Sequence, residues 1–125
     1  MKPANQLFQM LGMAARARKI ITGEELVVRE VRSGNARLVI ISKDASKNTM
    51  KKINDKCNSY NVEKHVYGTR EELGHAIGKE SRVVLALTDA GFAGKISGLL
   101  NELNRGWAND ENTCTRIRET SESDE

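Results

Sequence analysis

The chain carries two histidines and two cysteines, so enzyme chemistry is the first possibility to weigh. His65 and His75 are expected in a strand and a helix, and no serine or cysteine nucleophile stands in a recognisable catalytic motif. Cys57 and Cys114 lack the spacing of a zinc site or of a redox pair. We therefore predict that the protein is not an enzyme and has no metal site and no cofactor.

Two pairs of neighbouring carboxylates, Glu24–Glu25 and Glu71–Glu72, are candidates for acid–base work. Each pair stands where a helix is expected to begin, and negative charge suits the positive end of a helix dipole there. The segment 91–95 resembles a phosphate-binding loop only faintly, because it lacks the Walker spacing. The structural interpretation of both features outweighs the catalytic one.

Basic side chains indicate a different chemistry, the binding of phosphate. The chain has 20 Lys and Arg against 17 Asp and Glu, a net charge of +3, and its acids concentrate in residues 104–125. An ordinary solvated surface explains any single cluster of basic residues. The excess of basic over acidic residues within residues 1–103 favours a phosphate-binding face. Only 4% of residues are aromatic, which argues against single-strand stacking and favours structured RNA or a duplex. The basic residues at the ends of elements are Arg16, Arg18, Lys19, Arg29, Arg32, Lys43, Lys47, Lys51, Lys52, Lys56, Lys79 and Arg82.

The elements that must position these side chains alternate between helix and strand. Strands are predicted at 19–22, 38–41, 62–67 and 83–87. Two of them are apolar throughout, which requires cover on both faces of a sheet. We expect a three-layer α/β/α sandwich with a small four-stranded sheet, mostly parallel or mixed. The first predicted helix begins at Pro3, the second ends at Gly34 and the third begins at Ser46. The fourth runs from Thr69 to Gly78, and the fifth begins near Ala90.

Local signals mark the ends of these helices and the limits of the domain. Ser46 can cap the third helix, whose predicted core face is Met50, Ile53, Cys57 and Tyr60, and Thr69 with Glu72 forms a capping box. We predict one domain over residues 1–103 and a disordered acidic tail over 104–125. The alternative for the tail is a mimic of nucleic acid that competes for the basic face.

Two motifs at a characteristic separation suggest a family. Gly23, the helix leading to Arg32-Ser33-Gly34-Asn35-Ala36-Arg37, the strand 38–41 and Asp44-Ala45 resemble the kink-turn RNA-binding ribosomal proteins of archaeal and eukaryotic large subunits. The segment Glu72-Leu73-Gly74-His75-Ala76-Ile77-Gly78 and the strand after it are similar too. Residues 11–19 and 88–93 look more narrowly like the bacterial YlxQ-like branch.

The resemblance implies an RNA site built from three parts. The first is the start of the helix after the first short strand. The second is the loop after the central strand, which cradles a flipped-out nucleotide, and the third is a loop that packs over that nucleotide. The first part comprises Gly23, Glu24, Glu25, Leu26 and Arg29, and Lys19, which flanks the first short strand, is a further candidate RNA-binding residue. The second comprises Lys43, Ser46, Lys47 and Met50, and the third comprises Gly78, Lys79, Glu80, Ser81 and Arg82.

This chain departs from the family pattern in the first part. Glu25 stands where the family commonly has asparagine, Leu26 where it has glutamate, and Arg29 where it has lysine. A carboxylate cannot donate a hydrogen bond as an amide does, whereas Arg29 can contact a guanine edge or a phosphate. Ser46 and Met50 also have structural interpretations, as a helix cap and a core residue.

These observations together predict a non-enzymatic protein that binds structured RNA. The expected ligand is a kinked duplex, the expected setting is a ribosome or another ribonucleoprotein particle in the cytoplasm, and the protein is expected to be a monomer without contact to a membrane. The alternative is a protein-interaction module on the same fold with little RNA specificity.

Overall fold

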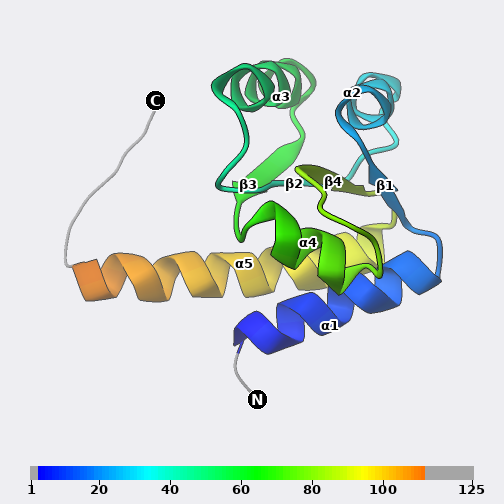
Figure 1. The fold of residues 1–125 in the computed structure, drawn as a ribbon. Helices are drawn as coiled ribbons and strands as arrows, with labels where there is room; N and C mark the ends of the chain where they lie inside the picture. The colour runs from blue at the N-terminus through cyan, green and yellow to red at the C-terminus, as the bar shows by residue number, and fades with distance from the viewer. Residues whose placement is uncertain (1–2, 112–125) are drawn as a thin grey trace.

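Helices and strands alternate along the chain (Figure 1). The structure is a computed structural model that describes the backbone of residues 3–111 and the side chains of residues 5–103. The strands are β1 (Ile20–Thr22), β2 (Leu38–Ile41), β3 (Glu63–Val66) and β4 (Val84–Leu87). The helices are α1 (Pro3–Arg16), α2 (Glu24–Ser33), α3 (Lys47–Tyr60), α4 (Arg70–Ala76) and α5 (Ala90–Glu111).

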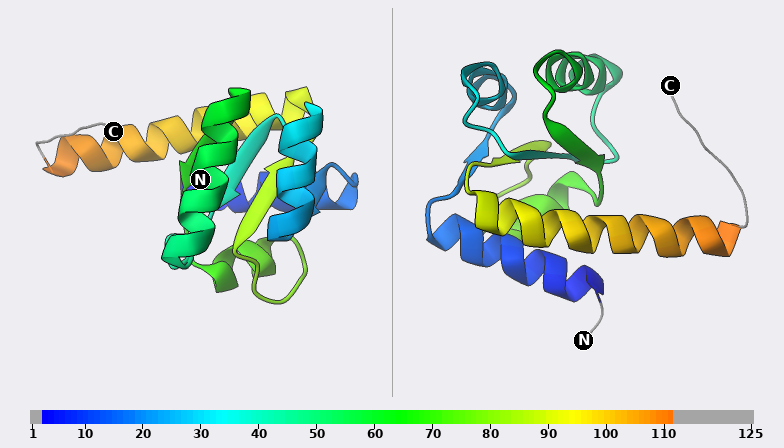
Figure 2. Two further views of the ribbon diagram at one scale, coloured as in Figure 1. Left: turned by 90° about the horizontal axis from the view of Figure 1, so that it is seen from above. Right: turned by 180° about the vertical axis from the view of Figure 1, so that it is seen from behind.

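The four strands form one mixed sheet in the order β1-β4-β2-β3. Only β2 and β3 are parallel, because β4 runs antiparallel to both β1 and β2. The expected α/β class with a small mixed sheet is confirmed, and the mostly parallel alternative is wrong. The reason is that α4 has only seven residues and stays at the end of the sheet where β3 finishes, so β4 starts from that same end (Figure 2).

Helices cover both faces of the sheet, as two wholly apolar strands require. Alternate residues of β2 and β4 enter different cores: Leu38 packs with α1, α4 and α5, whereas Val39 packs with α2 and α3. Figures 1 and 2 show the same layers, with α2 and α3 side by side on one face and α1 and α5 on the other. The three-layer sandwich is therefore present.

The predicted caps at the helix ends are present, whereas one predicted core residue of α3 is exposed. Ser46 caps α3, Thr69 and Glu72 form the capping box of α4, and Gly34 ends α2 in the left-handed conformation. Tyr60, expected in the core, is 46% exposed. A helix of 14 residues is about 21 Å long, whereas a strand of four residues is about 13 Å long. The helix is therefore longer than the strands it covers, and Tyr60, in its last turn, lines the hollow beside α2.

The last helix is longer than the sequence suggests. It continues to Glu111, so the predicted domain boundary between residues 103 and 104 falls inside α5. The part of the predicted disordered tail beyond it, residues 112–125, lies outside the described residues. Within the described part of the chain, no helix combines the length and the apolar character needed to cross a membrane.

Candidate nucleic-acid interface

The three predicted parts of the site meet at one end of the sheet. Backbone hydrogen bonds join them there: the amide of Gly23 donates to the carbonyl of Val84 over 3.4 Å, and the amide of Ser42 donates to that of Val83 over 2.7 Å. Figure 2, seen from above, shows the first turns of α2 and α3 beside α4 and the loop that follows it. Residues far apart in the sequence thus form one surface.

Lys19 does not belong to this surface. The amide of Thr88, which follows the last residue of β4, donates to the carbonyl of Lys19 over 2.9 Å. Because β4 begins beside Gly23 and ends beside Lys19, the lysine lies at the opposite end of the sheet. The structure therefore does not bring this predicted RNA-binding residue together with Gly23, since the strand between them, β1, carries the chain across the sheet.

Two helix N-termini lie next to each other at this end. Gly23 occupies the N-cap position of α2 with φ at +98°, a conformation that favours glycine, and contributes no side-chain cap. The hydroxyl of Ser46 accepts from the amide of Thr49 over 3.1 Å and so caps α3. The positive ends of two helix dipoles therefore face the same space, which favours an anion such as phosphate.

Glu24 reaches from the first turn of α2 to the first turns of α3. Its carboxylate accepts from the hydroxyl of Thr49 over 3.0 Å and forms an ion pair with the Lys52 ammonium, also at 3.0 Å. The hydrogen bond from Lys52, followed by that from Thr49, lowers the pKa of Glu24. The side chain thus fixes the spacing of two helix starts. Lys52 was predicted only as a basic surface residue, and neither it nor Thr49 was predicted as a partner of Glu24, because nothing local pairs them with a residue about 25 positions earlier.

The outer side of α2 presents exposed side chains of mixed character. Leu26 is 46% exposed, and Glu25 and Arg29 are exposed beside it. A hollow of about 470 Å³ continues along the helix toward the end of α3. Its lining comprises Glu25, Val28, Arg29, Arg32, Ser33 and Tyr60. Arg29 therefore lies within reach of both the α2 N-terminus and this hollow.

An ion pair holds the loop between β2 and α3. The Arg70 guanidinium donates to the Asp44 carbonyl over 2.7 Å and lies 3.4 Å from its carboxylate, which also accepts from the Arg70 amide. Lys43 and Lys47 are exposed on either side, and Met50 is half-buried against the core under α2 and α3. The structural interpretations of Ser46 and Met50 are therefore met. Arg70 was missed, although Asp44 belongs to the motif that identified the family.

The loop after α4 is pressed tightly against that helix. A Cβ atom at Gly74 would lie 1.7 Å from the carbonyl oxygen of Glu80, so only glycine fits there. Gly78 has φ at +74°, and the Lys79 amide donates to the Gly74 carbonyl over 2.8 Å. The side chains of Lys79, Glu80 and Ser81 are exposed and Arg82 is half-buried. The sequence placed Gly74 in a motif, but only the close approach explains its role.

Taken together, this end of the sheet can bind a polyanion. Two helix N-termini point to it, several exposed cations surround it, and its half-buried carboxylate, Glu24, is neutralised by α3. Among the residues whose side chains are described, no three His, Cys, Asp or Glu side chains cluster closely enough to hold a metal ion. The arrangement is suited to binding by charge and shape.

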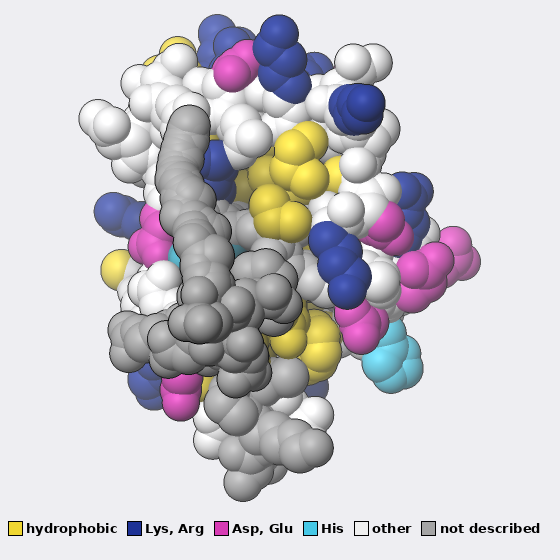
Figure 3. Space-filling view, turned by 90° about the vertical axis from the view of Figure 1, so that its left-hand side faces the viewer, with side chains coloured by type: hydrophobic (Ala, Val, Ile, Leu, Met, Phe, Trp, Pro, Cys, Tyr) yellow, Lys and Arg dark blue, Asp and Glu magenta, His cyan; other side chains and the backbone are white. Residues whose placement is uncertain are grey.

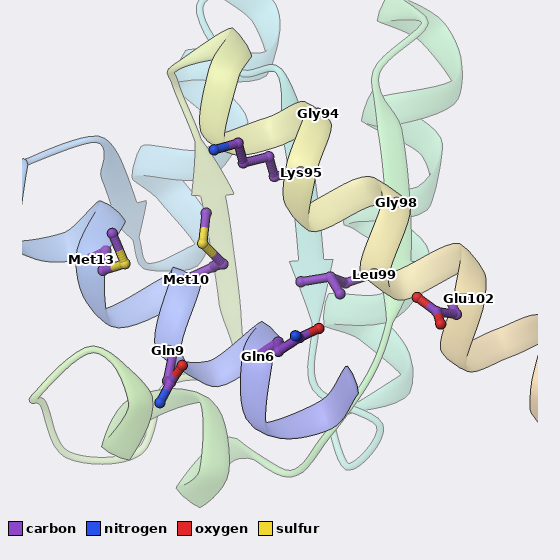
Figure 4. Close-up of a pocket in the computed structure, with 9 residues that line it drawn as sticks. All are labelled: Gln6, Gln9, Met10, Met13, Gly94, Lys95, Gly98, Leu99 and Glu102. Carbon is purple, nitrogen blue, oxygen red and sulfur yellow. The ribbon is translucent and has the colours of Figure 1, made fainter. Parts of the chain in front are cut away.

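A second hollow lies on the other side of the sheet and takes no part in this surface. It is a groove of about 630 Å³ between α1 and α5, where Met10, Met13 and Leu99 supply apolar side chains (Figure 4). Gly94 and Gly98 open its α5 wall, because nothing lies within 4 Å of a Cβ atom built at either. None of the predicted RNA-binding residues lines it.

Comparison with known proteins agrees with the motifs. Residues 5–97 match the model of the ribosomal protein L7Ae/L30e/S12e/Gadd45 family. The chain is 52% identical over 94 residues to RNA-binding protein YlxQ of Bacillus subtilis, covering 75% of this chain and 94% of that protein. A protein of the same name from Enterococcus faecium is 41% identical over 91 residues, covering 73% of this chain and 87% of that protein.

Solved structures show the same architecture. A protein of unknown function from Bacillus halodurans superposes with a TM-score of 0.75 at 49% identity, covering 76% of this chain and 96% of that one. The Giardia lamblia 15.5 kD RNA-binding protein superposes with a TM-score of 0.70 at 19% identity, covering 82% of this chain and 88% of that one. It therefore shares the fold. The predicted relationship to the kink-turn family and its YlxQ-like branch is confirmed. The chain belongs to the ribosomal protein L7Ae/L30e/S12e/Gadd45 family.

Proposed function

We propose that this protein binds RNA, without catalysis, and recognises a sharply kinked duplex. The observation that carries the proposal is the convergence of three separate segments on one end of the sheet, around the starts of α2 and α3. The names of the YlxQ relatives, which describe RNA-binding proteins, support it. We further propose that the protein acts as a monomer in the cytoplasm, on a ribosome or another ribonucleoprotein particle.

Binding would stabilise the bend by neutralising crowded phosphates. A sharp kink brings phosphates of the two arms close together, and their repulsion opposes the bend. Lys43 and Lys47 lie on either side of Ser46 at the start of α3, and Lys79 and Arg82 lie in the loop after α4, so their charges can offset that repulsion. Leu26 and Glu25 cannot donate hydrogen bonds from their side chains to a base edge, so we assign recognition mainly to shape and to Arg29.

The direct test compares two RNAs of equal length, one with a kink-turn and one a straight duplex. We expect tighter binding to the kinked RNA in a titration at fixed salt, because only the bent backbone can contact all three segments at once. Equal affinity for both RNAs would leave a nonspecific polyanion binder. Absence of binding to either would favour the protein-interaction module, for which the exposed Leu26 and Tyr60 would then be the contact residues.

A further inference from the structure

Exposed lysines follow one another along α3. Lys47, Lys51 and Lys52 are exposed, and Lys56 is half-buried. Lys52 is held by Glu24, whereas Lys47 and Lys51, one helical turn apart, form no ion pair with another residue whose side chain is described. Figure 3 shows Lys and Arg side chains gathered over α3 at the top of this side of the molecule. We call Lys47 and Lys51 the α3 lysine pair.

The chain leaves the fold on the same side of the molecule. The hydroxyl of Ser97, on α5, contacts the carboxylate of Glu63 on the edge strand β3. From Ser97 to Glu111 the helix runs on for about 21 Å, and Figures 1 and 2 show it passing beyond the edge where α3 and β3 lie. Residues 112–125 then follow, and fully extended they span up to about 48 Å. The segment is therefore long enough to return to α3.

The charge of this segment is complementary to α3. Its last seven residues contain Glu119, Glu122, Asp124 and Glu125 and no basic residue. The match to the family model ends at residue 97, and the Bacillus subtilis relative is covered over 94% of its length while a quarter of this chain stays unmatched. The shared fold is thus complete without the acidic segment, which leaves that segment free for a role particular to this chain.

We propose that residues 119–125 dock on the α3 lysine pair and compete there with RNA phosphate. Exposed ion pairs are individually weak and are screened by salt, but a segment on the same chain is present at an effective concentration in the millimolar range. Lys47 borders the proposed RNA surface, so RNA must displace the segment. The docking needs no RNA, whereas its effect on RNA affinity rests on the proposed function.

The docking is tested in the full chain without RNA. A variant with Glu119→Gln, Glu122→Gln, Asp124→Asn and Glu125→Gln is compared with wild type by amide chemical shifts in low salt. We expect shift differences around Lys47 and Lys51 that vanish in about 0.5 M salt, and none in the groove between α1 and α5. Differences confined to residues 112–125 and the end of α5 would overturn the proposal.

The competition is tested by RNA affinity in a double-mutant cycle. The four-amide variant should bind kinked RNA on the order of 3- to 10-fold more tightly at low salt, and Arg116→Gln with Arg118→Gln should weaken binding, because it makes the segment more acidic. The gain should shrink in a Lys51→Gln background and persist in a Lys95→Gln background, since Lys95 lies on α5 at the opposite face. An undiminished gain with Lys51→Gln would show an effect of overall charge and reject docking. If wild type binds no RNA, the proposed function fails, while the shift measurement still decides the docking.

Discussion

Glu24 shows how one residue can join two elements of the candidate site. Sequence analysis assigned it to the helix dipole, and the structure adds a hydrogen bond from Thr49 and an ion pair with Lys52. Both contacts cross from α2 to α3, so the residue sets the distance between the two helix starts. Substitutions of Glu24 should therefore change the shape of the surface as well as its charge.

Glu24→Gln should lower the stability of the protein at pH 7 by no more than about 1 kcal/mol, because the ion pair is partly exposed. The pKa of Glu24 is lowered in the folded protein, so its carboxylate stabilises the fold above the ordinary value of 4.5. That advantage is lost as the pH falls through the lowered pKa. Urea unfolding of both proteins should differ at pH 7 and converge in acid. Glu25→Gln, at an exposed neighbour without an ion pair in the described structure, is the control.

Arg29 is the residue to which we assign contact with the RNA beside the kink. Arg29→Ala should cost roughly 1–3 kcal/mol of binding free energy on a kinked RNA and little on a straight duplex. Arg32→Ala removes the same charge one turn further from Gly23, in the same hollow, and should cost less on the kinked RNA. Equal losses for the two variants on both RNAs would show that Arg29 acts only as a charge.

At the scale of elements, α4 and the loop after it form a tightly packed unit. The missing side chain of Gly74 leaves room for the backbone at Glu80, and the Arg82 amide donates to the Arg70 carbonyl over 3.0 Å. Arg70 in turn holds the loop before α3 through Asp44. Two of the three parts of the interface thus depend on one close approach of backbones.

Gly74→Ala should destabilise the protein by about 1–3 kcal/mol, as overpacking does, and should weaken RNA binding by displacing residues 78–82. Gly94→Ala is the matched control, because it also replaces a helical glycine but meets nothing within 4 Å. It should stabilise the protein by about 0.5–1 kcal/mol. Thermal unfolding measures both effects, and equal melting temperatures for the two variants would contradict the close approach.

At the scale of the whole molecule, binding should depend strongly on salt. Each phosphate neutralised contributes about −0.9 to the slope of log affinity against log salt on a duplex. Contacts from Lys43, Lys47, Lys79 and Arg82 together should therefore give a slope of several units in titrations between 50 and about 200 mM salt. A flat response at measurable affinity would reject binding through phosphates. Lys95→Ala, far from the interface, should leave the slope unchanged.

The sequence by itself determined the elements and proposed the segments of the candidate interface. The strand at 38–41, the Ser46 cap and the Thr69–Glu72 capping box all depend on residues within a few positions of one another, and all occur as predicted. The three segments of the candidate site were predicted because the family resemblance implies all of them. Local patterns of this kind can be recognised in a sequence, because the interactions that cause them are also between residues close together in the chain.

Tertiary structure decided what depends on distant partners. The short α4 set the direction of β4, and the course of β1 separated Lys19 from Gly23. Tyr60 lies in the last turn of α3 and is exposed in the hollow beside α2, although its spacing matches that of the core residue Cys57. Glu24 gained its role from residues of another helix. Each outcome depends on how elements far apart in the sequence are placed relative to one another, and the apolar pattern of a single element carries no information about that.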